Sequence, residues 1–397
     1  MTPAARVQAA IDLLDLIIAS ARDDGAAADT LIARYFRDRR YAGSKDRRAV
    51  RDLVYRAVRA YGDPPPSGRA AMVGMARQDT ELAALFDGSA HGPAPISADE
   101  QAPNGALLPS WIIAAFAGLI DEAEQAALLD RAPLHVRRNP LRASAEDVQA
   151  RWAEARALDG TAYGYALPAG TDVPDDGMAD VQDAGSQIIS QACQAQPGLT
   201  VLDLCAGAGG KTLALAADMV RGDSIKGRLI AADAVRDRLA RLVPRAERAG
   251  YAGQIETLLL NAGREGEALA PLAGQCDIVL IDAPCSGSGT WRRNPEARWR
   301  LTPARLDRVV ALQARLLELA LPLVKPGGRL VYAVCSLIDK EGRDQIQQIV
   351  SSAPLWQIIH SAGLGKKPGR SWGEGTLLTP AHDGTDGFFF AVLEKPC

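Results

Sequence analysis

From Gly198 onward, short apolar runs alternate with amphipathic segments of helical length. The apolar runs, which we expect to be strands, are residues 201–204, 229–233, 255–260, 278–282 and 330–334. The segments expected to be helices are 212–220, 235–249, 304–324 and 340–351. This alternation predicts an α/β fold with a doubly wound parallel sheet. Ligands of such sheets bind beyond the carboxyl ends of the strands, so residues at those ends are the first candidates for a site.

The sequence before this sheet predicts two smaller parts. Residues 1–62 have helical periodicity, residues 63–68 break it with prolines and a glycine, and helices resume from 111 to 129 after an irregular connection. Residues 133–180 mix short strands, a helix and turns. We therefore expect a helical domain at 1–130, a small α/β subdomain at 131–180 and the large sheet at 181–397. The segments 356–360 and 387–393 could close that sheet with antiparallel strands.

Composition narrows the class of protein. Acidic residues at positions 12 and 15 interrupt the apolar N-terminal stretch, and no apolar window reaches membrane-spanning length. We therefore expect a cytoplasmic protein without a membrane partner. We also expect it to be a monomer. The six scattered cysteines contain no C-x-x-C pair, which argues against a zinc site, another metal site or a disulfide framework. A net charge of -3 gives no general support for nucleic-acid binding.

Arginine clusters leave nucleic-acid binding open. One cluster lies within residues 34–51 and another within residues 292–308. Either could contact a phosphate backbone, or could be a solvated helix face.

The glycine-rich segment 203–212, DLCAGAGGKT, lies between the first strand of the sheet and its helix. A phosphate-binding P-loop would need glycine at Cys205, and a dinucleotide fingerprint would need glycine at Thr212. A nucleoside-type ligand without a pyrophosphate remains, and S-adenosylmethionine is such a ligand. Asp233 ends the second strand, where a carboxylate accepts hydrogen bonds from ribose hydroxyls. The alternative is that Asp233 caps the following helix; we expect its side chain to be little buried.

Two cysteines follow neighbouring strands of the predicted sheet. Asp282 ends one strand and Cys285 follows it after a proline, while Cys335 directly follows the next strand. A single cysteine at a strand end is more often a packing residue. Two thiols beside an acid predict a reactive cleft instead. The remaining cysteines, Cys193, Cys276 and Cys397, lack such a setting and are assigned structural roles.

Several of these motifs resemble one family. The segments DAPCSGSGTWRRNPEARWR, GGRLVYAVCSL and LDLCAGAGGKT, with Val181-Gln182-Asp183 and Thr385-Asp386-Gly387, closely resemble the Nop/Sun family of RNA cytosine-5 methyltransferases. The resemblance covers residues 130 to 395 and implies a Rossmann-like class I methyltransferase sheet. The segments SKDRRAVRDLVYRAVR and LPSWI are similar to the NusB-like extension of the RsmB type, which methylates small-subunit ribosomal RNA.

The resemblance also implies the cofactor-binding residues. S-adenosylmethionine would contact the loop residues Cys205, Ala206, Gly207, Ala208, Gly209, Gly210 and Lys211. Asp233 would bind its ribose, and Asp282 would lie near the base and the sulfonium. The chain departs from the family at Asn261, where an acid is usual near the adenine, and in the sequence Ala-Gly-Ala-Gly-Gly, which should loosen the loop.

The same resemblance implies a covalent mechanism. A thiolate at carbon 6 makes the cytosine ring an enamine, which can then attack a methyl sulfonium. We expect Cys335 to make this addition, Cys285 to assist the later elimination, Asp282 to hold or protonate N3, and Lys211 to stabilise a thiolate.

The expected partner is RNA with a splayed or single-stranded target base. Ribosomal RNA is the first candidate and transfer RNA the second. Arg292, Arg293, Arg298 and Arg300 would contact the RNA backbone, while Trp291 and Trp299 stack on bases or pack in a core. The alternative function is a non-catalytic RNA-binding factor for ribosome assembly or transcription that retains a retired methyltransferase fold.

Overall fold

The computed structural model describes residues 1–397 except 24, 104–105 and 360–367. The described residues form two compact units. Met1–Phe116 and Trp291–Pro303 make up the first unit, while Ala117–Thr290 and Ala304–Cys397 make up the second. The domain boundaries at residues 130 and 180 stay a prediction, and residue 360 of the predicted strand 356–360 lies outside the described residues.

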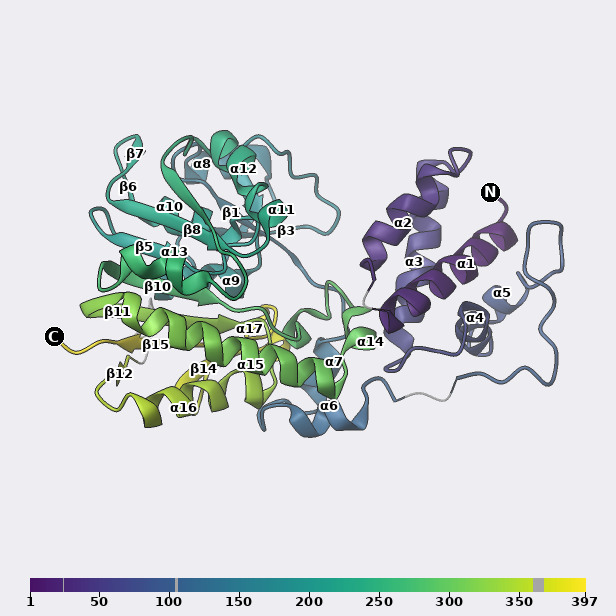
Figure 1. Ribbon diagram of the computed structural model, residues 1–397. Coiled ribbons are helices and arrows are strands. Elements are labelled where there is room, and N and C mark those ends of the chain that lie inside the picture. The colour runs from purple at the N-terminus through teal and green to yellow at the C-terminus, as the bar shows by residue number, and fades with distance from the viewer. Residues whose placement is uncertain (24, 104–105, 360–367) are drawn as a thin grey trace. The chain divides into compact units, whose positions relative to one another are not determined.

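The first unit is helical (Figure 1). Its helices are α1 (Pro3–Arg22), α2 (Ala28–Arg37), α3 (Ser44–Ala60), α4 (Gly68–Ala76), α5 (Thr80–Ala83), α6 (Ser110–Ala115) and α14 (Ala297–Arg300). Helix α1 buries Ile11, Leu14 and Ile18 in a core that it shares with α2, α3 and α4. Across both units, none of the helices in the described parts of the chain is long and apolar enough to cross a membrane.

The segment Trp291–Pro303 is distant in sequence but belongs to this helical unit. Arg298 is 1% exposed, and its guanidinium donates to the carbonyls of Val58, Arg59 and Tyr61 at 2.6, 3.0 and 2.9 Å. These carbonyls lie at the end of α3, where a helix has no further backbone donors to satisfy them. Burial, followed by the charge of Arg59, lowers the pKa of Arg298 to about 10, so the side chain stays charged at neutral pH. Arg298 therefore caps α3.

The second unit contains a small antiparallel sheet with its own core. The strands follow the order β2-β3-β1-β4, and α8 contributes Val148 to the core beneath them. The elements of this part are β1 (Leu134–Arg138), α8 (Ala145–Arg151), β2 (Arg156–Ala157), β3 (Gly164–Leu167) and β4 (Ala179–Val181). Ser144 and Asp147 form a capping box that fixes the start of α8.

The large sheet has the order β13-β14-β15-β11-β10-β5-β8-β9, and β12 pairs with β15. Its strands are β5 (Thr200–Asp203), β8 (Arg228–Asp233), β9 (Ile255–Leu259), β10 (Cys276–Asp282), β11 (Val324–Val334), β12 (Gln357–Ile358), β13 (Arg370–Trp372), β14 (Gly375–Leu378) and β15 (Phe388–Glu394). The strands from β11 to β9 are parallel, whereas β12 to β15 add antiparallel pairing. The predicted α/β fold with a Rossmann-like sheet is confirmed.

Helices connect and cover these strands. They are α7 (Glu122–Ala127), α9 (Ala184–Ala192), α10 (Gly210–Asp218), α11 (Arg236–Leu239), α12 (Leu242–Ala249), α13 (Glu265–Leu269), α15 (Pro303–Ala320), α16 (Arg343–Ser352) and α17 (Pro380–Asp383), with a small β6 (Val220–Arg221) and β7 (Ser224–Ile225) hairpin. The helix predicted at 235–249 is two helices, α11 and α12. Pro244 cannot donate a hydrogen bond to residue 240, which explains the break between them.

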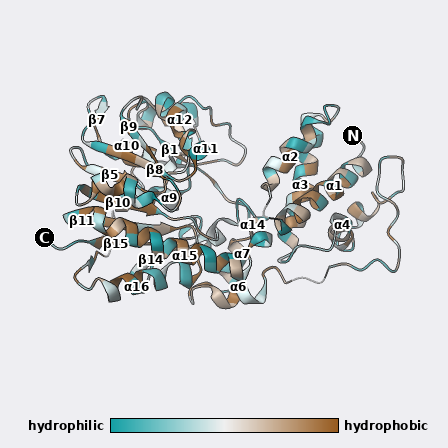
Figure 2. Cartoon of the chain, viewed as in Figure 1, coloured by the Kyte–Doolittle hydropathy of each residue, from teal (hydrophilic) through white to brown (hydrophobic). Residues whose placement is uncertain are grey.

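Many residues on the strands of the large sheet are hydrophobic, as the brown colour in Figure 2 shows. Ile278 and Leu280 of β10 and Val331 of β11 lie in one core with residues of α9, α10 and α12. Strands buried on both faces read as continuous apolar runs, which is why the sequence located them well. This rigid layer carries the residues at its carboxyl edge.

We predict that Arg298→Ala lowers the free energy of unfolding of the helical unit by about 2 kcal/mol, because buried carbonyls at the end of α3 lose charged donors. Urea denaturation of the whole chain measures this effect. Arg34→Ala, at an exposed position on α2, is the matched control and should change stability little. Equal stability of the two variants would show that Arg298 does not cap α3.

Candidate active site

The carboxyl ends of four adjacent strands bring the predicted site residues to one edge of the sheet. Asp203 ends β5, Asp233 ends β8 and Asp282 ends β10, while Cys335 follows β11. Because these strands are neighbours and parallel, their ends meet at the same edge. The loop between β5 and α10 crosses this edge.

The backbone conformation of the glycine loop requires glycine at two positions, Gly207 and Gly209. Gly207 and Gly209 have φ values of 56° and 84°, and a Cβ on Gly209 would lie 2.1 Å from Cδ1 of Leu242. Arg245 donates to the Ala208 carbonyl at 2.7 Å, and the Gln182 amide donates to the Gly210 carbonyl at 3.2 Å. The Ala-Gly-Ala-Gly-Gly sequence was expected to loosen this loop. Hydrogen bonds from Arg245 and Gln182, which belong to two other segments, hold it in place.

The expectation that Asp233 is little buried is wrong. Asp233 is only 8% exposed, and its two carboxylate oxygens accept hydrogen bonds from the backbone amides of Gly207 at 2.8 Å and Val235 at 2.6 Å. The contact with Val235 agrees with the capping alternative, because α11 begins at the next residue. Asp233 therefore ties the glycine loop to β8. Asn261 lies exposed beyond β9, the strand that pairs with β8.

Lys211 and Asp282 form an ion pair inside the site. The Lys211 ammonium donates to a carboxylate oxygen of Asp282 at 2.7 Å and lies 5.4 Å from the centre of the Phe388 ring. Burial alone would lower the pKa of Lys211, but the charge and hydrogen bond of Asp282, with the nearby Cys335, outweigh burial and raise it. Lys211 is thus a cation within electrostatic range of Cys335.

The two predicted thiols lie together. The Sγ atoms of Cys285 and Cys335 are 3.3 Å apart, and both residues are half-buried. The hydrogen bond with Cys335, followed by burial, raises the pKa of Cys285 well above its usual value. Burial and the neighbouring carboxylates of Asp203 and Asp282 raise the pKa of Cys205 in the same way, so Cys205 stays a neutral thiol. The predicted convergence of Cys285 and Cys335 is confirmed.

Asp203 is a buried acid behind the glycine loop. One of its carboxylate oxygens accepts from the Thr212 hydroxyl at 2.7 Å, and the other has no hydrogen-bond partner among the described residues. Burial raises the pKa of Asp203 from 3.8 to about 7, although the Thr212 hydrogen bond acts in the opposite direction. A carboxyl group in this state favours a cationic ligand beside it.

Sequence reasoning did not foresee how two of the quoted motifs meet. The Asp386 amide donates to the Asp183 carboxylate at 3.1 Å. The Gly387 amide donates to the Gly289 carbonyl at 2.8 Å, while the Gly289 amide donates to the Cys335 carbonyl at 3.0 Å. A Cβ on Gly289 would lie 1.9 Å from the Gly387 carbonyl oxygen, so only glycine permits this approach. The segment before β15 thus braces the loop that carries Cys285.

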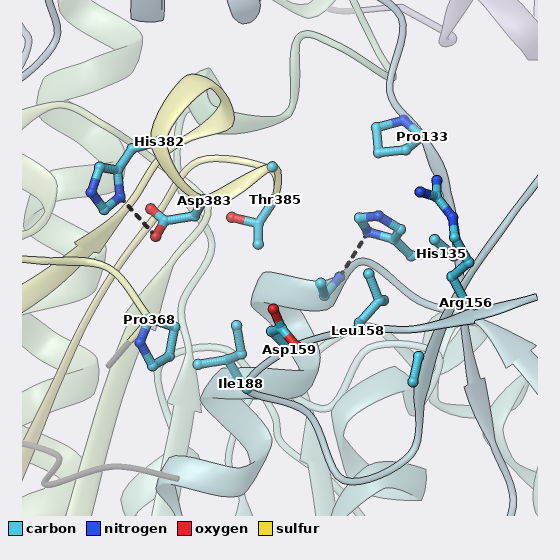
Figure 3. A pocket seen from close by; sticks show the side chains of 15 residues that line it. Pro133, His135, Arg156, Leu158, Asp159, Ile188, Pro368, His382, Asp383 and Thr385 are labelled. Carbon is cyan, nitrogen blue, oxygen red and sulfur yellow. Dashed lines mark hydrogen bonds and ion pairs between the residues drawn. The ribbon is translucent and has the colours of Figure 1, made fainter. Parts of the chain in front are cut away.

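A cavity of about 770 Å³ adjoins this braced segment (Figure 3). Figure 3 shows His382, Asp383 and Thr385 on one wall and His135 and Arg156 on the opposite wall. Leu158, Asp159 and Ile188 line the cavity between these two walls. Thr385 is a neighbour in sequence of Asp386, so the cavity adjoins the loop contacts described above.

The predicted RNA-binding arginines have different surroundings. Besides the role of Arg298 in capping α3, Arg300 donates to the carbonyls of Gly25 and Ala26. Arg292 is buried and Arg293 half-buried, and both interact with other residues. We therefore assign Arg298 to stability and no longer propose it as an RNA contact. Contact of the other three with RNA stays a prediction.

The two tryptophans of this segment are core residues. Trp291 is fully buried, and Trp299 packs in the core of the helical unit while its indole donates to the Tyr61 carbonyl at 2.8 Å. The packing alternative therefore holds for both.

Exposed arginines do line a groove of the helical unit. Arg47, Arg48 and Arg51 of α3 face Phe36 and Asp29 of α2 across a hollow of about 600 Å³. Arg51 pairs with Asp29, and Arg47 donates to the Ala42 carbonyl. These arginines come from the first of the two basic clusters in the sequence.

Comparisons with known proteins place this chain among ribosomal RNA methyltransferases. Residues 190–394 match the family model described as 16S rRNA methyltransferase RsmB/F. A probable ribosomal RNA small subunit methyltransferase B of Synechocystis sp. is 34% identical over 304 residues, which are 72% of this chain and 66% of that protein. The ribosomal RNA small subunit methyltransferase B of Salmonella paratyphi B is 33% identical over 55% of this chain and 48% of its own. The chain thus spans about two thirds and about half of these relatives.

Solved structures show the same fold. The crystal structure of PH0851 has a TM-score of 0.77 and 22% identity, and the alignment covers 100% of this chain and 99% of that one. A methyltransferase homolog protein from Pyrococcus horikoshii has a TM-score of 0.59 and 26% identity over 71% of this chain and 92% of its own. NSun6 from the same organism, with SFG, also has a TM-score of 0.59, at 16% identity over 69% of this chain and 93% of its own.

We predict that Asp203→Asn changes how stability depends on pH. The pKa of Asp203 rises from 3.8 to about 7 in the folded chain, so its contribution to stability is fully present below pH 3.8 and is lost as the pH rises through 7. Asparagine cannot ionise and keeps an acceptor for Thr212. Urea denaturation without cofactor should therefore show the variant gaining stability relative to wild type between pH 5 and pH 8. An unchanged difference across this range would mean that Asp203 ionises normally.

Proposed function

The chain belongs to the 16S rRNA methyltransferase RsmB/F family, and we propose that it methylates carbon 5 of cytosine in small-subunit ribosomal RNA with S-adenosylmethionine. The observation that carries this proposal is the 3.3 Å separation of two thiols at the edge of a methyltransferase sheet. A reaction with one covalent addition and one later elimination at adjacent ring carbons uses two such groups. We place this activity in the cytoplasm and expect the chain to act as a monomer.

The residues present fit S-adenosylmethionine. The carboxylates of Asp203 and Asp282 give the edge of the sheet a negative potential, which suits a ligand with a sulfonium and an ammonium group. The glycine loop and Asp233 would hold the nucleoside and Asn261 the adenine, while the bound cofactor would supply an electrophilic methyl group. Asp233 can accept from ribose in addition to its two amides, because each carboxylate oxygen has two lone pairs.

In the proposed reaction the Cys335 thiolate adds to carbon 6 of the target cytosine. The sulfur forms a bond to carbon 6, the electron pair of the ring double bond moves toward carbon 4, and N3 takes up a proton from the Lys211–Asp282 pair. Lys211 also stabilises the thiolate before the addition, since the charge of its ammonium interacts with Cys335. Carbon 5 of the resulting enamine would then take up the electrophilic methyl group that the bound cofactor supplies.

Elimination reverses the addition. The Cys285 thiol first gives its own proton to water, and the resulting thiolate takes the proton from carbon 5; the double bond to carbon 6 reforms and the Cys335 thiolate leaves. The proton on N3 returns to the Lys211–Asp282 pair. Carbons 5 and 6 are bonded neighbours, so the base and the nucleophile must be close to each other. The short Sγ to Sγ distance supports this division of roles.

The RNA must present an unpaired base to this site. We propose that the cavity between Arg156 and His382 receives a nucleotide next to the target, because its volume and its apolar walls with a few polar groups suit a nucleoside. The groove with Arg47 and Arg48 would bind phosphates elsewhere on the same RNA. Arg292, Arg293 and Arg300 remain further candidate contacts.

A non-catalytic RNA-binding factor is the second candidate function. The basic groove of the helical unit favours it, because that groove is independent of the thiols. The complete pair of Cys285 and Cys335 favours the enzyme. Calorimetric titration of the whole chain with S-adenosylmethionine separates the two, since a binding factor with a retired methyltransferase fold would release no heat.

We predict different failures for the two thiols. Cys335→Ala should abolish methylation of a small-subunit ribosomal RNA transcript and form no covalent complex, because addition comes first. Cys285→Ala should transfer the methyl group and stall before elimination, so a denaturant-resistant, nuclease-sensitive band should accumulate only with S-adenosylmethionine. Cys397→Ala, an exposed cysteine of the C-terminus, is the control. A stable complex with Cys335→Ala instead would reverse the two roles.

We predict that RNA affinity falls steeply with salt, because a chain of net charge -3 holds a polyanion only through local arginines. Replacing Arg47 and Arg48 by alanine should lower the affinity and reduce the slope of log K against log salt by about 0.7 to 0.9 for each lost contact. Filter binding at several salt concentrations measures this slope. Arg264→Ala, at an exposed arginine of the other unit, is the control, and equal slopes for both variants would exclude the groove.

A further inference from the structure

A buried glutamate that the mechanism does not use lies directly behind the two thiols. Glu341 is fully buried in a short 3-10 turn, Asp339–Glu341, which follows Cys335 closely in sequence. Its carboxylate accepts from the amide of Ser286 at 2.7 Å and from the hydroxyls of Ser286 and Ser336. These serines are the residues that follow Cys285 and Cys335. One carboxylate therefore joins the two cysteine-bearing loops.

Gln313 completes this arrangement from α15. Its side-chain amide donates to the Pro284 carbonyl at 2.9 Å and to the Glu341 carboxylate at 3.1 Å. Cys285 is thus held through the residue before it and the residue after it. The Tyr332 hydroxyl of β11 donates to the Glu341 carbonyl at 2.6 Å, which fixes the turn to the strand that leads to Cys335.

A purely structural explanation accounts poorly for this choice of residue. Burying a carboxylate costs free energy even when it is hydrogen-bonded, and apolar residues often replace such groups without loss of stability. Here the side-chain and amide donors to the carboxylate come from Ser286, Ser336 and Gln313, and the first two adjoin the thiols. The free energy of burying Glu341 is therefore spent at the place where the distance between the thiols of Cys285 and Cys335 has to be fixed.

We propose that Glu341 is a positioning residue. Through its hydrogen bonds with Ser286 and Ser336, it holds Cys285 and Cys335 at the separation that their successive steps require. The proposal rests on the two-thiol reaction proposed above. Glu341 touches neither substrate nor cofactor in that reaction, and it acts only through the two serines.

The charge of Glu341 has a second effect. The raised pKa of Cys285 has four causes, which are, from the largest, the hydrogen bond with Cys335, burial, the charge of Cys335 and the charge of the Glu341 carboxylate. Removing this charge lowers the pKa of Cys285. The pH at which Cys285 begins to act as a base then moves to lower values, a change that loosened packing alone would not produce.

The test uses single-turnover reactions of the whole chain with a small-subunit ribosomal RNA transcript. A transcript containing 5-fluorocytidine reports covalent addition, because the fluorine cannot be eliminated, and the ordinary transcript reports product release. Glu341→Gln should slow both phases at least tenfold, shift the pH profile of release to lower pH and leave binding of S-adenosylmethionine within twofold. Ser336→Ala should slow mainly addition, and Ser286→Ala mainly release. Glu318→Gln, at an exposed position on α15, is the matched control.

The outcomes separate the positioning role from the reaction itself. If wild type forms no adduct with the fluorinated transcript, the two-thiol reaction is wrong and the positioning role is lost with it. If wild type forms the adduct and Glu341→Gln reacts at the same rate with an unchanged pH profile, only the positioning role is overturned. Should Glu341→Gln fail to fold, the serine variants decide, since wild-type rates in both would contradict the proposal.

Discussion

The parallel pairing of β10 with β11 is the constraint on which the site depends. In this register Asp282 lies opposite Ala333, and the Ala283 amide donates to the Ala333 carbonyl at 2.8 Å. Cys285 and Cys335 then follow their strands by similar distances along the chain, so their side chains reach the same place. A slip of one residue would turn one thiol to the other face of the sheet. The fully buried centres of both strands fix the register and with it the thiol pair.

Several charged side chains are buried around Cys285 and Cys335, and ion pairs or hydrogen bonds compensate their charges. Lys211 pairs with Asp282, and Glu341 accepts hydrogen bonds from the two serines that follow the thiols. Burial raises the pKa of Asp203 behind the loop, and the Thr212 hydrogen bond and the charge of Lys211 offset this only in part. The site thus holds a cation, Lys211, whose charge acts on the proposed nucleophile, and a carboxylate, Glu341, that is hydrogen-bonded to the residues after both thiols.

The sequence predicted the parts of this site that follow strands. Apolar runs identified β5, β8, β10 and β11, and the residues at their ends meet as expected. It could not show that Asp233 is tied to backbone amides, because a carboxylate at a strand end serves ribose and helix caps equally well. Glu341 was missed for a related reason: a charged residue in a short turn looks like a surface residue until the fold buries it.

The role of an arginine that follows Cys285 could not be predicted from the sequence either. Arginines that follow a catalytic loop are natural RNA contacts, yet Arg298 serves the helical unit, because the carbonyls at the end of α3 need donors. Nothing local in the sequence connects residue 298 with residues 58 to 61. The exposed groove of Arg47 and Arg48, within the first basic cluster, instead keeps its charges on the surface.

Peptide mapping of the trapped complex tests the central claim most directly. The unaltered chain would be incubated with S-adenosylmethionine and 5-fluorocytidine RNA, then digested with nuclease and protease for mass spectrometry. The two-thiol account predicts that the peptide containing Cys335 carries a methylated fluorocytidine nucleotide and that the peptide containing Cys285 is unmodified. A nucleotide on Cys285, or on neither cysteine, would contradict it.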